Sequence, residues 1–337
     1  MIALVVFSML LTTFSFYFYQ MFNGSNVLLD QENQVITIAK GESFDDLRAR
    51  LYDDKIIQDA LSFSFVAKVL GYQDAVKPGV YLFEKGMSNL ALVRRLRAGD
   101  QIPVRITFNN VRLKPELAEK ITTNTGIAQA DFEALLNDEA FLEKYNLNPD
   151  NSMTVFLPNT YEVYWTITAE ELFDKMYKEY EQYWTAERKQ KAAALNLTPT
   201  QVSVLASIVQ AESIIGSEKR TIAGLYLNRL EQNIHLQADP TLVYALGDFT
   251  IQRVLNVHKN IESPYNTYKY RGLPPGPINL PTLESLNAVL DFEEHNYIYM
   301  CAKEDFSGYH RFATNLREHN RNAEKFQRAL NQRLIFK

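Results

Sequence analysis

The chain has 337 residues, and its 35 Lys and Arg against 40 Asp and Glu give a formal net charge of −5. Its 46% hydrophobic and 22% charged residues are ordinary for globular proteins, which excludes disordered and collagen-like classes. The length allows two or three domains. The mild acidity argues against a nucleic-acid partner, because phosphate binding needs clustered Lys and Arg. A single cysteine, Cys301, excludes an intrachain disulfide.

The first 22 residues are almost all apolar or aromatic, and no charged side chain precedes Asp30. About 20 such residues span a hydrocarbon core of roughly 30 Å. The segment Gln20-Met21-Phe22-Asn23 offers no small-residue cleavage site. We therefore expect residues 1–22 to be an uncleaved transmembrane anchor, with a removed signal peptide or a buried core helix as alternatives. No Lys or Arg precedes the run, so charge does not orient it.

The next part of the chain predicts a small α+β module. After a polar linker, residues 23–35, short strands are expected at 34–39 and 80–83, with helices from Ser43 and over 59–69 between them. A further helix over 88–96 and a strand over 104–108 follow. This order resembles a LysM-like module over residues 36–110, although periodicity alone equally allows a generic α+β domain.

The rest of the chain predicts a mostly helical linking region and a C-terminal domain. Residues 111–197 are expected to be helical apart from an interruption at 156–161, and Thr198-Pro199 begins an α+β domain that extends over 198–337. The complete chain is thus predicted to be α+β, with an anchor, a module, a linking region and a catalytic domain. Cys301 lies in an apolar segment that predicts a core strand.

A helix beginning at Thr198-Pro199 carries the main chemical signal. Thr198, Pro199 and Gln201 match a capping box with proline in the first turn. The apolar stripe of Val202, Leu205 and Val209 leads to Glu212. A carboxyl group on a buried face is hard to ionise and suits a general acid. The alternative is a structural Glu that pairs with Arg220 or Arg229 or reaches solvent. Glu218 fits the dipole at the start of a second helix.

Polar clusters further along the chain suggest a sugar-binding surface. Tyr, Asn and Thr at 265–268 precede the Pro- and Gly-rich segment 272–278, where regular helix is excluded. Such a stiff loop could stack on and hydrogen-bond a sugar, or it could be a purely structural loop. The five histidines show no metal-ligand spacing, and no phosphate-binding or dinucleotide motif occurs. We therefore expect no metal and no cofactor.

Taken together, these motifs resemble the YceG-like family of endolytic murein transglycosylases, the MltG type. The matching segments are 205–213, 228–230, 236–241, 265–268, 272–278, 314–316 and 319–320. The resemblance places the family's catalytic glutamate at Glu212. Two positions depart from the family pattern: Gln210 stands where many members carry Glu, and Asn159 where they carry Asp.

The resemblance implies a lytic cut within peptidoglycan glycan strands. Glu212 would protonate the oxygen between N-acetylmuramic acid and N-acetylglucosamine, and the muramyl C6 hydroxyl would attack C1 to leave a 1,6-anhydro end. The expected role is to limit the length of nascent strands. Substrate contacts are expected from six residues: Gln237, Asp239, Asn266, Thr267, Tyr268 and Asn315. The family also implies a single-pass protein of the cytoplasmic (inner) membrane, with an extracytoplasmic catalytic domain and the wall-synthesis machinery as a partner.

Two other functions remain open from the sequence. One is a membrane-anchored peptidoglycan-binding protein without activity. The other is a murein hydrolase in which Asp239 supplies the second carboxylate that most glycosidases need.

Overall fold

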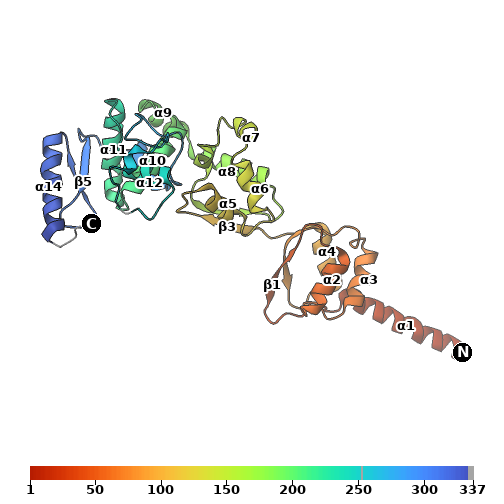
Figure 1. Ribbon diagram of the computed structural model, residues 1–337. Coiled ribbons are helices and arrows are strands. Elements are labelled where there is room, and N and C mark those ends of the chain that lie inside the picture. Colours follow the sequence, from red (N-terminus) through yellow and green to blue (C-terminus); the bar gives the residue numbers. More distant parts are fainter. Residues whose placement is uncertain (252, 333–337) are drawn as a thin grey trace. The chain divides into compact units, whose positions relative to one another are not determined.

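The computed structural model describes residues 1–251 and 253–332 of the chain (Figure 1). They form two compact units. The first unit holds Met1–Ile106, Thr122–Ala128 and Tyr161–Thr168, and the second holds Thr107–Ile121, Gln129–Thr160 and the chain from Ala169 onward. The mixture of helix and sheet after an N-terminal apolar helix confirms the predicted class. Residues 333–337, the end of the predicted C-terminal domain, lie outside the described residues.

The first unit is built around one antiparallel strand pair. Its elements are α1 (Ile2–Asn23), β1 (Asn33–Ile38), α2 (Phe44–Asp53), α3 (Ala60–Val69), β2 (Gly79–Glu84), α4 (Asn89–Ala98) and the start of β3 (Val104–Phe108). β1 pairs with β2 so that Val35 faces Leu82. The predicted strand–helix–helix–strand order is therefore confirmed, while the closer likeness to LysM stays a prediction.

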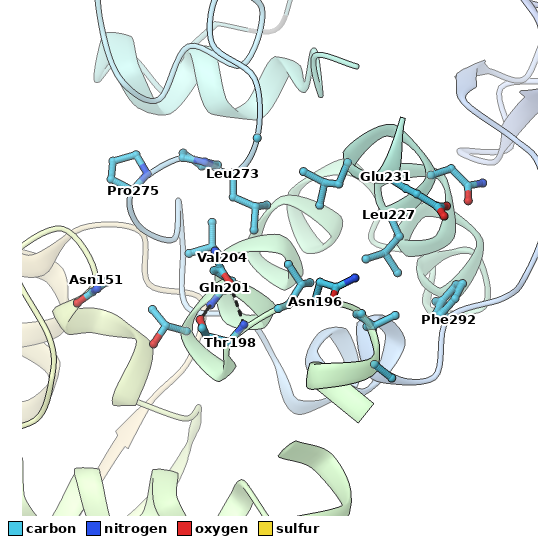
Figure 2. A pocket seen from close by; sticks show the side chains of 18 of the residues that line it. Asn151, Asn196, Thr198, Gln201, Val204, Leu227, Glu231, Leu273, Pro275 and Phe292 are labelled. Carbon is cyan, nitrogen blue, oxygen red and sulfur yellow. Dashed lines mark hydrogen bonds between the residues drawn. The ribbon is translucent and has the colours of Figure 1, made fainter. Parts of the chain in front are cut away.

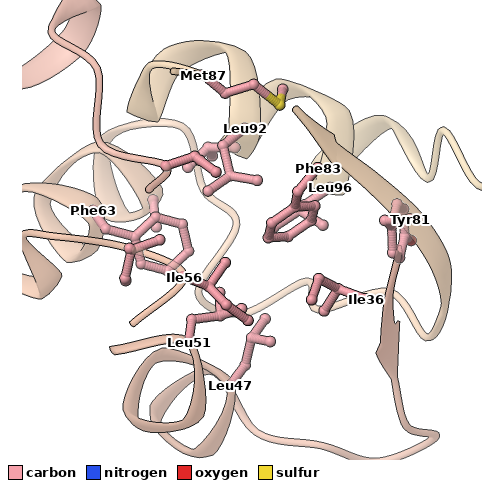
Figure 3. Packing of buried hydrophobic residues seen from close by; sticks show 14 of the residues in the cluster. Ile36, Leu47, Leu51, Ile56, Phe63, Tyr81, Phe83, Met87, Leu92 and Leu96 are labelled. Carbon is pink, nitrogen blue, oxygen red and sulfur yellow. The ribbon is translucent and has the colours of Figure 1, made fainter. Parts of the chain in front are cut away.

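Apolar side chains from both strands and three helices form the core of this unit. The buried cluster includes Ile36, Leu47, Phe63, Phe83 and Leu92, which converge between the sheet and the helices (Figure 3). Side-chain caps fix where the helices begin, since the Ser43 hydroxyl, the Asp59 carboxylate and the Ser88 hydroxyl each accept a backbone N–H of their helix.

Among the described residues, α1 is the one helix that by itself is long and apolar enough to cross a membrane. None of its residues is buried. The C-terminal part of α1 is held by the unit: the Asn89 side-chain amide donates to the Met21 carbonyl at 2.9 Å, Phe22 packs against the core cluster, and the Phe18 ring contacts Phe65.

The second unit is mostly helical, and among the described residues the β5–β6 strand pair lies wholly within it. Its helices are α5 (Lys114–Thr122), α6 (Gln129–Leu135), α7 (Glu139–Glu143), α8 (Ala169–Tyr183), α9 (Ala186–Ala194), α10 (Pro199–Glu212), α11 (Gly216–Glu231), α12 (Asp239–Leu246), α13 (Leu283–Leu290) and α14 (Leu316–Gln332), with 3-10 turns at Ser152–Val155 and His258–Asn260. β5 (Tyr299–Ala302) pairs with β6 (His310–Ala313), and α14 packs against both (Figure 1). β4 (Asn159–Val163), which the sequence showed only as a break between helices, pairs with β3.

Helix α10 is the central helix of the second unit. It packs against α9, α11, α12 and α13 (Figure 1). Every residue from Val202 to Val209 is buried, including Ser203 and Ser207. The sequence predicted an apolar stripe on one face, whereas the buried residues surround the helix. α13 packs against it, and the 278–279 segment before α13 hydrogen-bonds to Ser207. Its C-terminal end, at Glu212, opens to two cavities.

Candidate active site

Glu212 is the last residue of α10, and the position is fixed from the other end of the helix. Thr198 and Gln201 form the predicted capping box, with Pro199 in the first turn. At the C-terminal end, the Tyr226 hydroxyl of α11 donates to Glu212 Oε1 at 2.6 Å. A core helix with a fixed start and a fixed partner at its end leaves the carboxyl group little freedom.

Burial makes the Glu212 carboxyl a weak acid. Desolvation is the largest cause and, with the nearby Asp239 carboxylate, raises its pKa from 4.5 to about 7. The Tyr226 hydrogen bond, His310 and Arg229 act in the opposite direction, because each stabilises the carboxylate. A carboxyl group that holds its proton near neutral pH has the property required of a general acid.

Two cavities meet at Glu212. One has a volume of about 280 Å³ and is lined by residues of α11, the 236–239 segment, Tyr268 and the β5–β6 hairpin. The other, about 780 Å³, is lined by residues of the 109–112 segment, α12 and the 278–282 segment. Glu212 and Asp239 line both cavities. Glu212 is therefore open to two cavities on different sides.

Three of the predicted substrate contacts line the smaller cavity with Glu212. They are Gln237, Asp239 and Tyr268. The Tyr268 hydroxyl donates to Asp239 Oδ1 at 2.6 Å, which turns both side chains toward one position. Gln237 has a left-handed backbone with φ of 52°, a conformation that is uncommon for residues other than Gly.

The other three predicted contacts lie elsewhere. Asn266 is fully buried, and its side-chain amide donates to the carbonyls of Lys259 and Ile261, both at 2.9 Å. The buried Thr267 hydroxyl accepts the Ala238 N–H at 3.0 Å. Neither residue is among those lining the two cavities at Glu212. Thr267 holds the 237–239 segment and Asn266 holds the 259–261 turn, while direct substrate contact by either stays a prediction. Asn315 lies before α14, where its Oδ1 accepts the Glu318 N–H.

Arg229 lines the smaller cavity but is not a direct partner of Glu212. Its guanidinium donates to the carbonyls of Ile298 at 2.6 Å and Leu236 at 2.7 Å. Arg220, the other arginine considered from the sequence, donates to the Asp291 carbonyl. The hypothesis that Glu212 forms a structural ion pair is therefore not supported. Arg229 ties α11 to two loops while its charge still acts on the pKa of Glu212.

Glu218 has a partner that the sequence did not suggest. It lies in the first turn of α11, as predicted, but its side chain is buried and accepts the backbone N–H of His310 at 2.8 Å. Its other oxygen lies 3.0 Å from His310 Nδ1. His310 lines the same cavity as Glu212. The two residues are 92 positions apart, and nothing in their spacing indicates the contact.

Gln210 is bonded in a way that explains an amide at this position. Its Nε2 donates to Asn279 Oδ1 at 3.1 Å and the Leu280 carbonyl at 3.0 Å, and its Oε1 accepts the Thr282 N–H at 2.6 Å. A carboxylate could not donate the first two bonds. Gln210 therefore attaches the 279–282 segment to α10, while Glu212 is left as the carboxyl group at this helix end.

A cavity of about 1060 Å³, larger than either cavity at Glu212, lies at the other end of α10 (Figure 2). Its lining includes Asn196, Gln201, Leu227 and Leu273, with Glu231 as its one charged residue. The segment 272–275 that the sequence associated with sugar binding contributes to this cavity and not to the one around Tyr268. The cavity of about 1060 Å³ and the acid–base group Glu212 therefore lie at opposite ends of α10.

The described geometry defines a site with one weakly acidic carboxyl group at the junction of two open cavities. A model of the YceG-like family matches residues 36–325, and the chain belongs to this family. It is similar to proteins named endolytic murein transglycosylase from Streptococcus pneumoniae serotype 2, with 28% identity over 98% of this chain and 66% of the relative. A Bacillus subtilis protein of the same name is 28% identical over 88% of this chain and 86% of its own length.

A crystal structure supports the fold. A yceG-like protein from Listeria monocytogenes aligns with 86% of this chain and 98% of its own, with a TM-score of 0.57 and 26% sequence identity. The chain spans slightly less than two thirds of the length of the pneumococcal relatives.

Proposed function

We propose that this protein is a membrane-anchored endolytic murein transglycosylase, a lyase that cuts the bond between N-acetylmuramic acid and N-acetylglucosamine within peptidoglycan strands. The observation that carries the proposal is Glu212: one carboxyl group, with its pKa raised to about 7, at the junction of two cavities. Relatives named endolytic murein transglycosylase support the substrate class.

A lytic cut needs one acid–base group at the reacting bond. Protonated Glu212 gives its proton to the bridging oxygen as the bond from C1 to that oxygen breaks. The muramyl C6 hydroxyl forms the new bond to C1, and the Glu212 carboxylate takes the proton of that hydroxyl. This nucleophile is already part of the substrate, so its high effective molarity replaces water or a protein nucleophile. The Tyr226 hydrogen bond stabilises the carboxylate that is left after proton transfer.

The two cavities support a cut within strands. Because Glu212 and Asp239 line both, sugars on either side of the reacting bond have space to continue. Gln237, Asp239 and Tyr268 are the proposed contacts on one side. The proposed consequence is a limit on strand length, and contact with the wall-synthesis machinery would follow from acting on nascent strands.

Helix α1 supports a single-pass anchor. Its 22 residues carry no charge and none is buried. We place the anchor in the cytoplasmic (inner) membrane and the catalytic unit on the extracytoplasmic side, where peptidoglycan lies. The five-part division of the chain into 1–22, 23–35, 36–110, 111–197 and 198–337 is retained as part of this proposal.

Product analysis tests the reaction type. Digestion of murein in heavy-oxygen water should place no label at the new ends, which should resist borohydride reduction and be one water lighter than lysozyme products. Long products should dominate early digestion. Murein without any cleavage would instead support a binding protein that lacks activity.

A hydrolase remains the second candidate because Asp239 lines both cavities with Glu212. The Tyr268 hydroxyl donates a hydrogen bond to one of the two Asp239 carboxylate oxygens. Labelled, reducible ends from the wild type, lost in Asp239→Asn, would establish Asp239 as the base that activates water. Unlabelled ends from the wild type would exclude this role whatever the variant's rate.

A further inference from the structure

Helix α3 is apolar on both of its faces. Its inner residues Phe63, Val66 and Ala67 are buried in the core of the first unit. On the outside, Leu61, Phe65 and Val69 are 83%, 40% and 55% exposed. Positions four apart lie on one helix face, so the three form a continuous stripe. A surface helix of a soluble module is expected to be polar on this face.

The outward stripe is also nearly free of charge. Besides the three apolar residues, the outward positions of α3 are Ser64 and Lys68. The helix contains no acidic residue, and the carboxylate of Asp59 at its start is occupied by the N–H groups of Leu61 and Ser62. A lysine at the edge of an apolar stripe can bury its methylene chain and keep its ammonium group in water.

The stripe adjoins the membrane helix. The Phe65 ring centroid is 6.1 Å from that of Phe18 and 6.2 Å from that of Phe22, both edge-to-face. Asn89 and Phe22 hold the last turn of α1 to the unit, which fixes this arrangement. α3 therefore packs directly against the C-terminal part of α1.

The part of α1 that Phe65 contacts determines how deep Phe65 lies in the membrane. A helix of 22 residues is roughly 33 Å long, and the hydrocarbon core is roughly 30 Å thick. If α1 spans that core, its last turn, around Phe22, lies at the boundary between acyl chains and headgroups. Phe65, which contacts both Phe18 and Phe22, then lies at the same level.

We propose that the outward face of α3, defined by Leu61, Phe65 and Val69, docks on the lipid bilayer as an interfacial helix. The inference rests on the proposed anchor and adds a second contact with the membrane. Apolar residues bury in the headgroup–acyl boundary and Lys68 lies near lipid phosphates, as in amphipathic helices that lie in the interface plane. The docked helix would hold the first unit against the membrane rather than leave it to swing about α1.

Depth measurements on the complete chain in lipid vesicles test this proposal. Single cysteines replace Leu61, Val69, Leu10 or Val35 in a Cys301→Ser background and carry a nitroxide label. Collisions with oxygen, which concentrates in lipid, are compared with collisions with a water-soluble nickel complex. Val35 is the control because it is 55% exposed and apolar but lies on β1.

The labels at positions 61 and 69 should favour oxygen, and the label at 35 should favour the nickel complex by several-fold. Labels at 61 and 69 that match position 35, while position 10 reports lipid, overturn the docking and leave the anchor intact. A position 10 exposed to the nickel complex overturns both. Protection of positions 61 and 69 from both reagents would identify a protein partner on this face and also overturn lipid docking.

The buried contact between Glu218 and His310 carries a second, independent inference about the reaction. Glu218 accepts the backbone N–H of His310 with one carboxylate oxygen, and its other oxygen lies within hydrogen-bond distance of His310 Nδ1. With Nδ1 donating to a carboxylate, neutral imidazole presents Nε2 as an acceptor. Within the described chain this Nε2 has no hydrogen-bond partner, and His310 lines the cavity with Glu212. The other ionisable side chains lining it are Glu212, Tyr226, Arg229, Asp239, Tyr268 and Cys301.

We infer that His310 is the base of the lytic step and that Glu218 is its positioning residue. The O6–C1 bond forms as the bond from C1 to the bridging oxygen breaks. The O6 proton passes to His310 Nε2, and the Glu212 proton passes to the departing oxygen. The imidazolium then returns a proton to the Glu212 carboxylate. This arrangement divides the roles that the proposed function gives to Glu212 alone.

Three variants test this division of roles. In His310→Gln, kcat should fall about 10²- to 10³-fold with KM within threefold, because the amide cannot accept the O6 proton. Added imidazole should restore part of the rate of His310→Gly. Glu218→Gln should lose about tenfold, and Glu304→Gln, which breaks the Arg311 ion pair on the same hairpin, should lose less than twofold.

A folded His310→Gln variant with near-normal kcat would overturn the role of His310. Wild-type products decide the proposed function separately, since 1,6-anhydro ends from the wild type retain the lyase whatever His310 does. Failure of His310→Gln to fold leaves the imidazole rescue of His310→Gly and the loss of rate in Glu218→Gln as the tests, and absence of both effects overturns the inference.

Discussion

The two ends of α10 face cavities of opposite character. The cavity at its start, about 1060 Å³, is lined by amides, hydroxyls and apolar side chains, with Glu231 as its one charged residue among the described residues (Figure 2). The smaller of the two cavities at Glu212, about 280 Å³, is lined by ionisable groups from three helices, a loop and a hairpin. Proton transfer needs a desolvated acid with fixed partners, so burial and contacts locate the reaction better than volume does.

The sharpest test of this comparison is to remove the acid. Glu212→Gln keeps the shape of the side chain but has no proton to donate, so activity should fall about 10²- to 10⁴-fold. Initial rates of murein cleavage measure it. Glu231→Gln makes the same chemical change in the larger cavity and is the matched control. Equal losses in the two variants would refute the assignment of chemistry to the Glu212 end.

The same variant should change stability in a pH-dependent way. A pKa raised from 4.5 to about 7 means that the folded state holds the Glu212 proton more tightly than the unfolded state. Ionisation therefore destabilises the fold progressively as pH rises from 4.5 to 7. Glu212→Gln lacks this penalty and should gain up to about 3 kcal/mol at pH 8 and nothing at pH 4. Denaturant titrations at both values test it, and a pH-independent difference would contradict the assigned burial effect.

Removing the partner of the acid should move the pH profile. Tyr226→Phe deletes the hydrogen bond that lowers the pKa of Glu212, so the alkaline limb should shift to higher pH by about 1 to 2 units. The rate at pH 6 should change less than the rate at pH 9. A profile that scales uniformly without shifting would show that Tyr226 acts on packing alone.

The smallest effect is expected in the larger cavity. Glu231 is exposed, and Glu231→Gln should change kcat/KM by less than twofold if this cavity takes no part in catalysis. Leu227→Ala, a half-buried residue of the same lining, should lower stability by about 1 to 2 kcal/mol while leaving the pH–rate profile unchanged. A shifted profile in either variant would connect the two ends of α10.

Local sequence determined the elements around the site. The capping box with Pro199 fixed the start of α10, and the apolar periodicity fixed its length to Glu212. The same kind of signal located α1, the cap at Ser43, and the β1 and β2 strands. These features depend on residues within a few positions of one another, so a sequence pattern contains them.

Contacts between side chains that are distant in the sequence are visible only in the tertiary structure. Tyr226 reaches Glu212 across 14 positions, and His310 reaches Glu218 across 92. The tertiary structure also distinguishes Tyr268, which lines the smaller cavity, from its neighbours Asn266 and Thr267. The side chain of Asn266 bonds to Lys259, and that of Thr267 bonds to Ala238. The raised pKa of Glu212 follows from the same packing, because desolvation comes from atoms distant in sequence that close around the end of one helix.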